Sequence, residues 1–160
     1  MALLFISMIF VSNSSVAINY TDDKEEVTPM EVIELKDGIT VEQYEMFDKY
    51  SKIYGANFDD LIMVAKCESR YKHENLYGDK GTSYGIFQYQ APTFKRYSSL
   101  MGEELNYKSE EDQIKLTAFI FAKHPEERKA WTTWVAYTKG GSYTFYSGLT
   151  NKKHTAFCNR

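Results

Sequence analysis

The sequence lacks an excess of positive charge. It holds 19 Lys and Arg against 22 Asp and Glu, for a formal net charge of -3. Proteins that bind nucleic acid through its phosphates usually show a basic patch and a high isoelectric point. We therefore expect no nucleic-acid partner.

Long apolar segments are also lacking. The apolar run at residues 2–11 (ALLFISMIFV) has the length of a signal-peptide core and is too short to span a bilayer. Small residues follow at 15–17 (SVA), so we interpret 1–17 as a signal peptide cleaved after Ala17. No Lys or Arg precedes Lys24, so the usual positive start is missing, and a short buried helix is the alternative. We expect an exported chain, periplasmic, envelope-bound or extracellular, with no membrane span after cleavage.

Residues that form disulfides or hold metals are few. The two cysteines, Cys67 and Cys158, could pair in an oxidising compartment and pin the tail to the central helix. The alternative is a buried free Cys67 with an unattached Cys158. The histidines, His73, His124 and His154, show no paired spacing on a helix face. We expect neither a metal site nor a cofactor.

What the sequence does contain is helical periodicity. Residues 18–39 are polar and acidic and are interpreted as a linker or arm, followed by one domain over 40–160. Apolar stripes and cap signals predict helices over about 40–55, 57–70, 91–102, 109–125 and 126–140. Periodicity disappears between 71 and 90, which predicts a loop with short strands.

A carboxylate interrupts the apolar face of the second predicted helix. Leu61, Val64 and Ala65 precede Glu68 by seven, four and three residues, so the four side chains share one face. Burial and the negative end of the helix dipole both disfavour the ionised form, which raises the pKa. Glu68 is therefore a candidate general acid.

The simpler interpretation of Glu68 is an ion pair with a flanking Lys66, Arg70 or Lys72. The next segment favours a site. Residues 78–88 (GDKGTSYGIFQ) combine glycines and hydroxyls with Asp79, a composition suited to holding sugar hydroxyls, although a plain hairpin has a similar composition.

Three motifs in order resemble the soluble lytic transglycosylase and goose-type lysozyme families. They are Glu68-Ser69 after an apolar helix, Gly85 to Gln88 (GIFQ), and residues 136–140 (AYTKG). The last is similar to the family's Ala-Tyr-Asn-Ala-Gly, with Thr138 and Lys139 replacing Asn and Ala. The resemblance covers about residues 41–141.

The resemblance implies a mainly α, lysozyme-like α+β fold, in which a small loop and short-strand insertion forms a glycan cleft. Glu68 would be the catalytic acid/base and GIFQ a strand. Ser69 would orient Glu68 or the substrate, and Tyr137 would place its hydroxyl near the carboxyl. The predicted substrate-binding residues are Ser69, Asp79, Ser83, Tyr84, Gln88, Tyr89 and Tyr137.

The function so implied is lytic cleavage of the MurNAc-GlcNAc β-1,4 bond of peptidoglycan, with a 1,6-anhydro product and a single Glu. Glycan strands would be the partner of a monomeric chain. One alternative is a goose-type hydrolase using Asp79 as its second carboxylate. Asp79 is equally suited to a turn, and Gln90 occupies the position where such hydrolases often carry another Asp. The other alternative is a non-catalytic relative that binds peptidoglycan.

Two tryptophans, Trp131 and Trp134, lie three residues apart on one face of the last predicted helix. They could stack on sugars, but we expect core packing. Glu74, just before the glycine-rich loop, is interpreted as solvated.

Overall fold

The structure is a computed structural model that describes residues 38–147 and 152–158. These residues belong to the compact unit that spans 32–160, and the description that follows concerns that unit alone. The predicted signal peptide with its cleavage site lies outside the described residues, as does almost all of the predicted arm at 18–39.

Helices dominate the described unit, and the strands are short. The α-helices are α1 (Val41–Tyr54), α2 (Phe58–Ser69), α3 (Ala91–Met101), α4 (Glu110–Lys123) and α5 (Thr132–Thr138). Two 3-10 helices are η1 (Asp79–Gly81) and η2 (Pro125–Ala130). The strands are β1 (Tyr77–Gly78), β2 (Ser83–Tyr84), β3 (Tyr89–Gln90), β4 (Ser142–Ser147) and β5 (Lys152–Phe157). The mainly α class with short strands is confirmed.

Local cap chemistry sets the helix ends. Thr40 and Gln43 form a capping box at the start of α1, because each side chain accepts from the other's backbone N–H. Asn57 and Ser109 cap α2 and α4 through their side-chain oxygens. Gly102 ends α3 in the left-handed conformation. These boundaries agree with those predicted.

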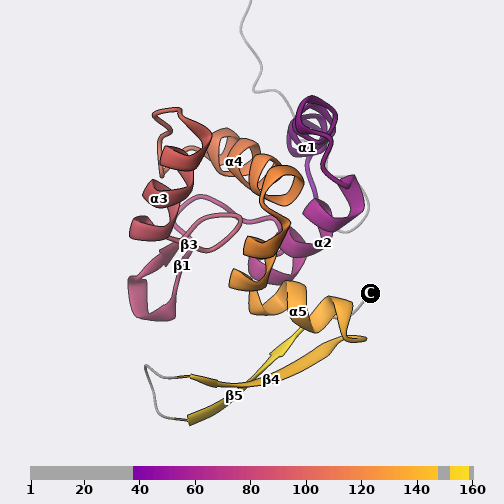
Figure 1. Cartoon of the computed structure of the whole chain (residues 1–160), viewed down its shortest axis with the longest axis vertical. Helices are drawn as coiled ribbons and strands as arrows, with labels where there is room; N and C mark the ends of the chain where they lie inside the picture. The colour runs from indigo at the N-terminus through magenta and orange to yellow at the C-terminus, as the bar shows by residue number, and fades with distance from the viewer. Residues whose placement is uncertain (1–37, 148–151, 159–160) are drawn as a thin grey trace, which may run out of the picture. The chain divides into compact units, whose positions relative to one another are not determined.

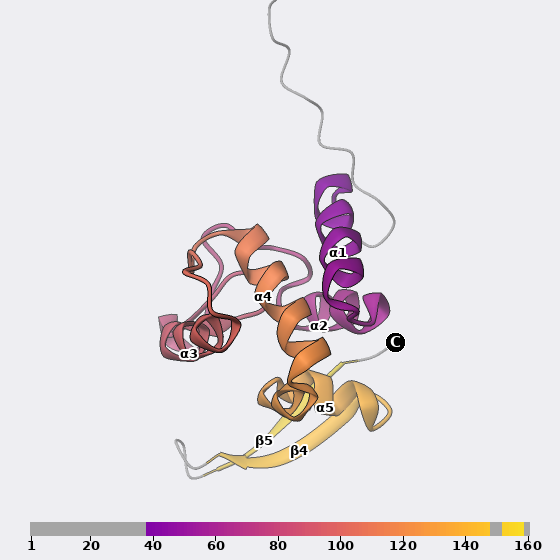
Figure 2. The same ribbon diagram turned by 45° about the horizontal axis from the view of Figure 1, so that its top comes forward.

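The core lies around α4, which runs between α1 and α3 (Figures 1 and 2). Its apolar side chains meet residues from the helices on either side and from the turn after β2. Fully enclosed members include Phe47, Leu61, Val64, Ile86, Phe87, Tyr97, Ile114, Leu116, Ile120 and Phe121.

The first three strands form a small antiparallel sheet in the order β1-β2-β3. Residues 85–88, predicted as a strand, instead make the turn between β2 and β3, closed by Gln88 N–H donating to Gly85 O at 3.1 Å. Gly85 has φ 82°, and a Cβ there would lie 2.6 Å from Gln113 Nε2 and 2.8 Å from His73 Cε1. The strand prediction is wrong because this turn needs a left-handed residue with no side chain.

The helix predicted over 126–140 is broken at Trp131. η2 precedes this residue and α5 follows it, while Trp131 itself is extended with ψ 106°. The break sends its indole into the core, where Nε1–H donates to Phe87 O at 3.1 Å. The core role predicted for Trp131 is confirmed, and Trp134 packs half-buried against Phe121.

An antiparallel hairpin that was not predicted follows α5. β4 pairs with β5 from Ser142 opposite Phe157 onward, and the two strands project beyond the helices (Figure 1). Cys158, just after β5, forms a disulfide with Cys67 at a Cα–Cα distance of 5.4 Å. Of the two alternatives that the sequence left open, the structure shows the disulfide, which joins the hairpin to the last turn of α2.

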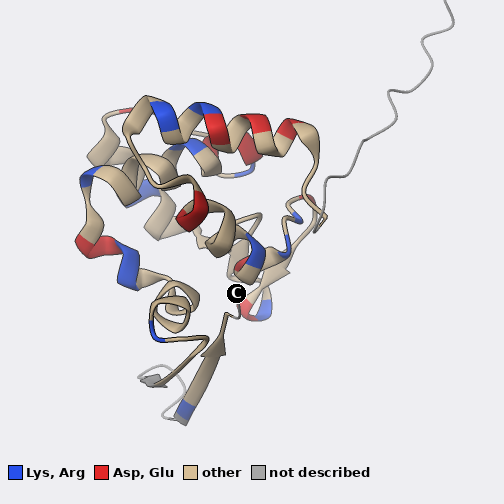
Figure 3. Ribbon diagram, turned by 90° about the vertical axis from the view of Figure 1, so that its right-hand side faces the viewer, with Lys and Arg blue, Asp and Glu red and all other residues tan. Residues whose placement is uncertain are grey.

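Charges of both signs are interspersed on the ribbon in the view of Figure 3. On α1, acidic residues precede the lysines, an order that complements the helix dipole. Within residues 38–147 and 152–158, no helix combines the length and apolar character that crossing a membrane requires.

Candidate active site

Glu68 lies in the last turn of α2, and the three apolar residues that share its face are fully buried. Its carboxyl is half-buried and accepts a hydrogen bond at Oε1 from the Thr133 hydroxyl of α5. The ion pairs of the described residues do not include Glu68, so the alternative of a pair with a flanking Lys or Arg is not what the structure shows. The hydrogen-bond donor to the Glu68 carboxyl is therefore an uncharged hydroxyl, that of Thr133.

Burial raises the pKa of Glu68 from its ordinary value of 4.5 to about 7. The hydrogen bond from Thr133 opposes this rise, because it favours the ionised form. The negative charge of Asp79 adds to the rise. A carboxyl with a pKa raised toward neutrality suits a group that both gives and takes a proton.

Three predicted residues form one cluster beside the small sheet, which we call the Asp79 cluster: Asp79, Ser83 and Gln88. The Ser83 hydroxyl lies 3.2 Å from Asp79 Oδ2 and 3.2 Å from Gln88 Oε1. Gln88 Nε2–H donates to Gly85 O at 2.8 Å, which leaves its Oε1 toward Ser83. The Asp79 carboxylate itself is exposed. The Ser83 hydroxyl has one hydrogen and can donate to only one of these two oxygens at a time. The other oxygen, of Asp79 or of Gln88, can then accept a hydrogen bond from another donor.

The Asp79 cluster depends on Gly78, the last residue of β1. A Cβ at this position would lie 2.1 Å from Gln88 Oε1 and 2.9 Å from Ser83 Oγ. Its backbone dihedrals are extended, so space rather than conformation demands glycine. Glycine at position 78 therefore leaves the space that the Gln88 and Ser83 side chains occupy.

Two predicted groove residues belong to the interior. Tyr89 is 2% exposed, and its hydroxyl shares a 2.9 Å hydrogen bond with Thr117 of α4. Tyr84 is 7% exposed, and the Lys108 ammonium lies 3.4 Å from its ring centroid. The prediction that these rings line a groove is wrong. α4 and Lys108 cover the two rings.

Ser69 also differs from its predicted role. It is buried, and its hydroxyl donates to Ala65 O one turn earlier at 2.9 Å. Its only hydrogen is therefore used within α2, so Ser69 does not donate to Glu68 or to a substrate. The donor to Glu68 is Thr133.

Thr133 is the residue that sequence reasoning missed. It lies four residues before Tyr137, so both side chains share one face of α5. The half-buried Tyr137 ring packs 5.8 Å from Trp134, and its predicted hydroxyl contact with Glu68 stays a prediction. The sequence signal that could have identified Thr133 is its spacing, since it is a hydroxyl residue one helical turn before the motif tyrosine Tyr137.

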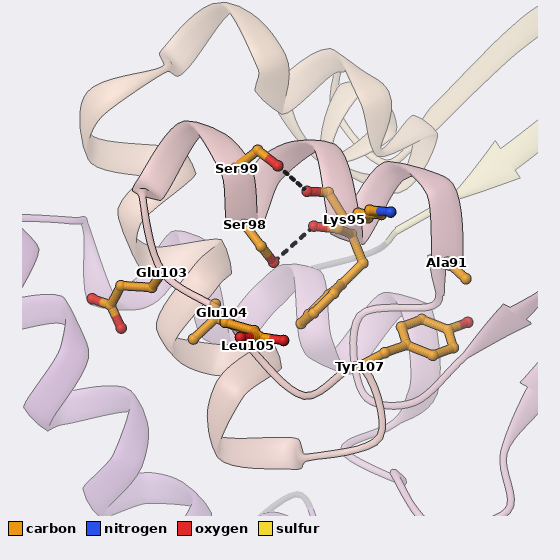
Figure 4. Close-up of a pocket in the computed structure, with 9 residues that line it drawn as sticks. Ala91, Lys95, Ser98, Ser99, Glu103, Glu104, Leu105 and Tyr107 are labelled. Carbon is orange, nitrogen blue, oxygen red and sulfur yellow. Dashed lines mark hydrogen bonds between the residues drawn. The ribbon is translucent and has the colours of Figure 1, made fainter.

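A separate hollow of about 530 Å³ lies where α3 meets the loop to α4 (Figure 4). It shares no residue with Glu68 or the Asp79 cluster. Its two serines, Ser98 and Ser99, donate to carbonyls of their own helix at 2.9 and 3.0 Å. Their hydrogens are thus already used, and the predicted glycan cleft at Glu68 stays a prediction.

Within the described part of the chain, no group of three or more His, Cys, Asp or Glu is placed to hold a metal ion. Comparison with family models, with curated proteins and with solved structures found no match to the chain.

Proposed function

We propose that the chain is a peptidoglycan lytic transglycosylase that cleaves the MurNAc-GlcNAc β-1,4 bond and forms a 1,6-anhydro-MurNAc end. One observation carries this proposal: the Glu68 carboxyl is half-buried on an apolar face of α2 and accepts a hydrogen bond from Thr133, and this burial raises its pKa to about 7. A general acid that must also act as a base works best when its pKa lies near the working pH. The three motifs at Glu68, at Gly85 to Gln88 and at residues 136–140 supply the substrate class.

The reaction needs one carboxyl. Glu68 gives its proton to the glycosidic oxygen as the bond from that oxygen to C1 breaks. The carboxylate then takes the proton of the sugar's own 6-hydroxyl as O6 bonds to C1, which restores the acid. No water is consumed. An intramolecular hydroxyl acts at a high effective concentration, so no protein nucleophile is required.

Asp79 favours a second candidate function, hydrolysis. Its charge contributes to the raised pKa of Glu68, so the two carboxyls belong to one electrostatic site. Hydrolases of this kind use the second carboxylate to activate water or to attack the sugar. In the Asp79 cluster, however, Oδ2 lies 3.2 Å from the Ser83 hydroxyl beside a tight turn, an arrangement that suits the turn role equally well. A non-catalytic binder is disfavoured because burying a carboxyl costs stability and contributes nothing to binding alone.

The disulfide between Cys67 and Cys158 supports the proposal that the chain acts outside the cytoplasm. Such bonds persist in the periplasm, at the cell surface and in the medium, where peptidoglycan is also accessible. We extend the proposal to an exported protein that acts as a monomer on glycan strands.

The test is mass spectrometry of the muropeptides released from purified peptidoglycan. Wild type should release anhydro-muramyl products, one water lighter than reducing ends, and Glu68→Gln should release none. Glu74→Gln is the matched control, because Glu74 is exposed six residues farther along. Reducing ends from wild type, lost in Asp79→Asn, would establish the hydrolase. No products from a folded wild type would refute both enzyme proposals.

A further inference from the structure

The two oxygens of the Glu68 carboxyl are not equivalent. Oε1 accepts the hydrogen of the Thr133 hydroxyl. A proton on Oε1 would require the Thr133 hydroxyl to turn and accept that hydrogen instead of donating its own. A proton on Oε2 leaves the hydrogen bond from Thr133 intact, because a neutral carboxyl can still accept at its carbonyl oxygen.

We propose that Thr133 is a positioning residue that holds the Glu68 carboxyl through Oε1 and so favours the acid proton on Oε2. This inference rests on the proposed function. Thr133 is fixed for the task because α5 packs against α2, and the Cys67–Cys158 disulfide ties α2 to the hairpin that continues from α5.

Thr133 also acts after the proton has left. Glu68 is then an anion in a half-buried site, and the hydrogen bond from Thr133 becomes charge-assisted and stronger. A contact that strengthens as charge develops assists proton transfer, since it stabilises the later state more than the earlier one.

The charged and polar groups around Glu68 set the direction of the test. α2 contributes apolar Leu61, Val64 and Ala65, and η1 contributes the negative Asp79, which raises the pKa. α5 contributes Thr133, which lowers it. Loss of the Thr133 hydroxyl therefore moves the titration of Glu68 upward, whereas loss of the Asp79 charge moves it downward.

The experiment is a carbon-13 NMR titration of the Glu68 carboxyl in the full chain, beside the muropeptide assay. Thr133→Val keeps the shape and removes the hydroxyl, whereas Thr133→Ser keeps the hydroxyl. Thr132→Val is the matched control on the same helix, because the Thr132 hydroxyl has no hydrogen-bond partner among the described residues.

Thr133→Val should raise the titration midpoint by about one pH unit, the size expected when a charged group loses one hydrogen bond. Its kcat should fall by about tenfold, part of what a correctly placed general acid contributes. Thr133→Ser should restore both values, and Thr132→Val should change neither. Thermal melting of each variant verifies folding.

A midpoint in Thr133→Val equal to that of wild type would overturn the inference, as would an undiminished kcat. The titration separates the two proposals, because it requires no turnover. A raised midpoint in a protein without muropeptide release would leave the hydrogen bond established and refute the transglycosylase. Release by wild type with an unmoved midpoint would refute only the role of Thr133.

Discussion

Replacing Glu68 by Gln should stabilise the fold at alkaline pH and have little effect at acidic pH. The carboxyl has a pKa of about 7 in the folded chain, against an ordinary 4.5 when unfolding returns it to water. Below pH 4.5 both states carry the proton, and Glu68 costs the fold nothing through ionisation. As the pH rises through 7 the folded chain must bury an anion, and that share of stability is lost. Gln keeps the size and the acceptor oxygen for Thr133 without titrating.

The magnitude follows from the two values. One pKa unit corresponds to 1.36 kcal/mol, so a rise from 4.5 to about 7 amounts to about 3 kcal/mol. The free energy of unfolding of Glu68→Gln, minus that of wild type, should therefore increase by about 3 kcal/mol between pH 4 and pH 8. This is a large fraction of the stability of a small domain.

Urea titration followed by tryptophan fluorescence measures this difference at each pH, since Trp131 lies in the core. Glu45→Gln on α1 is the control, because Glu45 is exposed and its substitution should leave the pH dependence as in wild type. Parallel curves for wild type and Glu68→Gln across pH 4–8 would refute the reasoning. The carboxyl would then be hydrated in the folded chain, and the basis for a general acid would be gone.

Two further predictions concern what holds the site together. Gly78→Ala should displace Gln88 from Ser83, because the new Cβ would lie 2.1 Å from Gln88 Oε1. Muropeptide release should then fall, and urea unfolding should show a loss of about 1 kcal/mol of stability for the broken hydrogen bond. Unchanged release would contradict the role of the Asp79 cluster. The double variant Cys67→Ser/Cys158→Ser should lose about 4 kcal/mol of stability, since the bond spans a separation of 91 residues. Added reductant should lower the urea midpoint of wild type and leave that of the double variant unchanged. Equal urea midpoints of wild type and double variant in oxidising buffer would contradict this prediction.

Local chemistry explains which parts of the fold were predictable. The ends of α1 through α4 coincide with Thr40, Asn57, Pro92, Gly102 and Ser109, whose cap and turn preferences act within a few residues. Glu68 was predictable for a similar reason, because its position on a buried helical face follows from spacing alone.

The remaining features depend on contacts distant in sequence. Trp131 leaves the helix to reach Phe87, and the Tyr89 hydroxyl shares a hydrogen bond with Thr117. None of these pairings is visible as periodicity. The β4–β5 hairpin had a weak signal in its alternating aromatic and hydroxyl residues, SYTFYS, but two short strands carry too few positions to decide between strand and loop.

The order of residues along the chain has a chemical consequence for Glu68. Its hydrogen-bond donor follows 65 residues later, and the partner of its neighbour Cys67 follows 91 residues later. While the chain is being made, and whenever it is unfolded, water surrounds this carboxyl. Its pKa is then the ordinary 4.5, and at neutral pH it is an ion with no proton to give. Under the proposed function, the general acid forms only once folding has buried this carboxyl, so catalysis would begin with folding and not in the nascent chain.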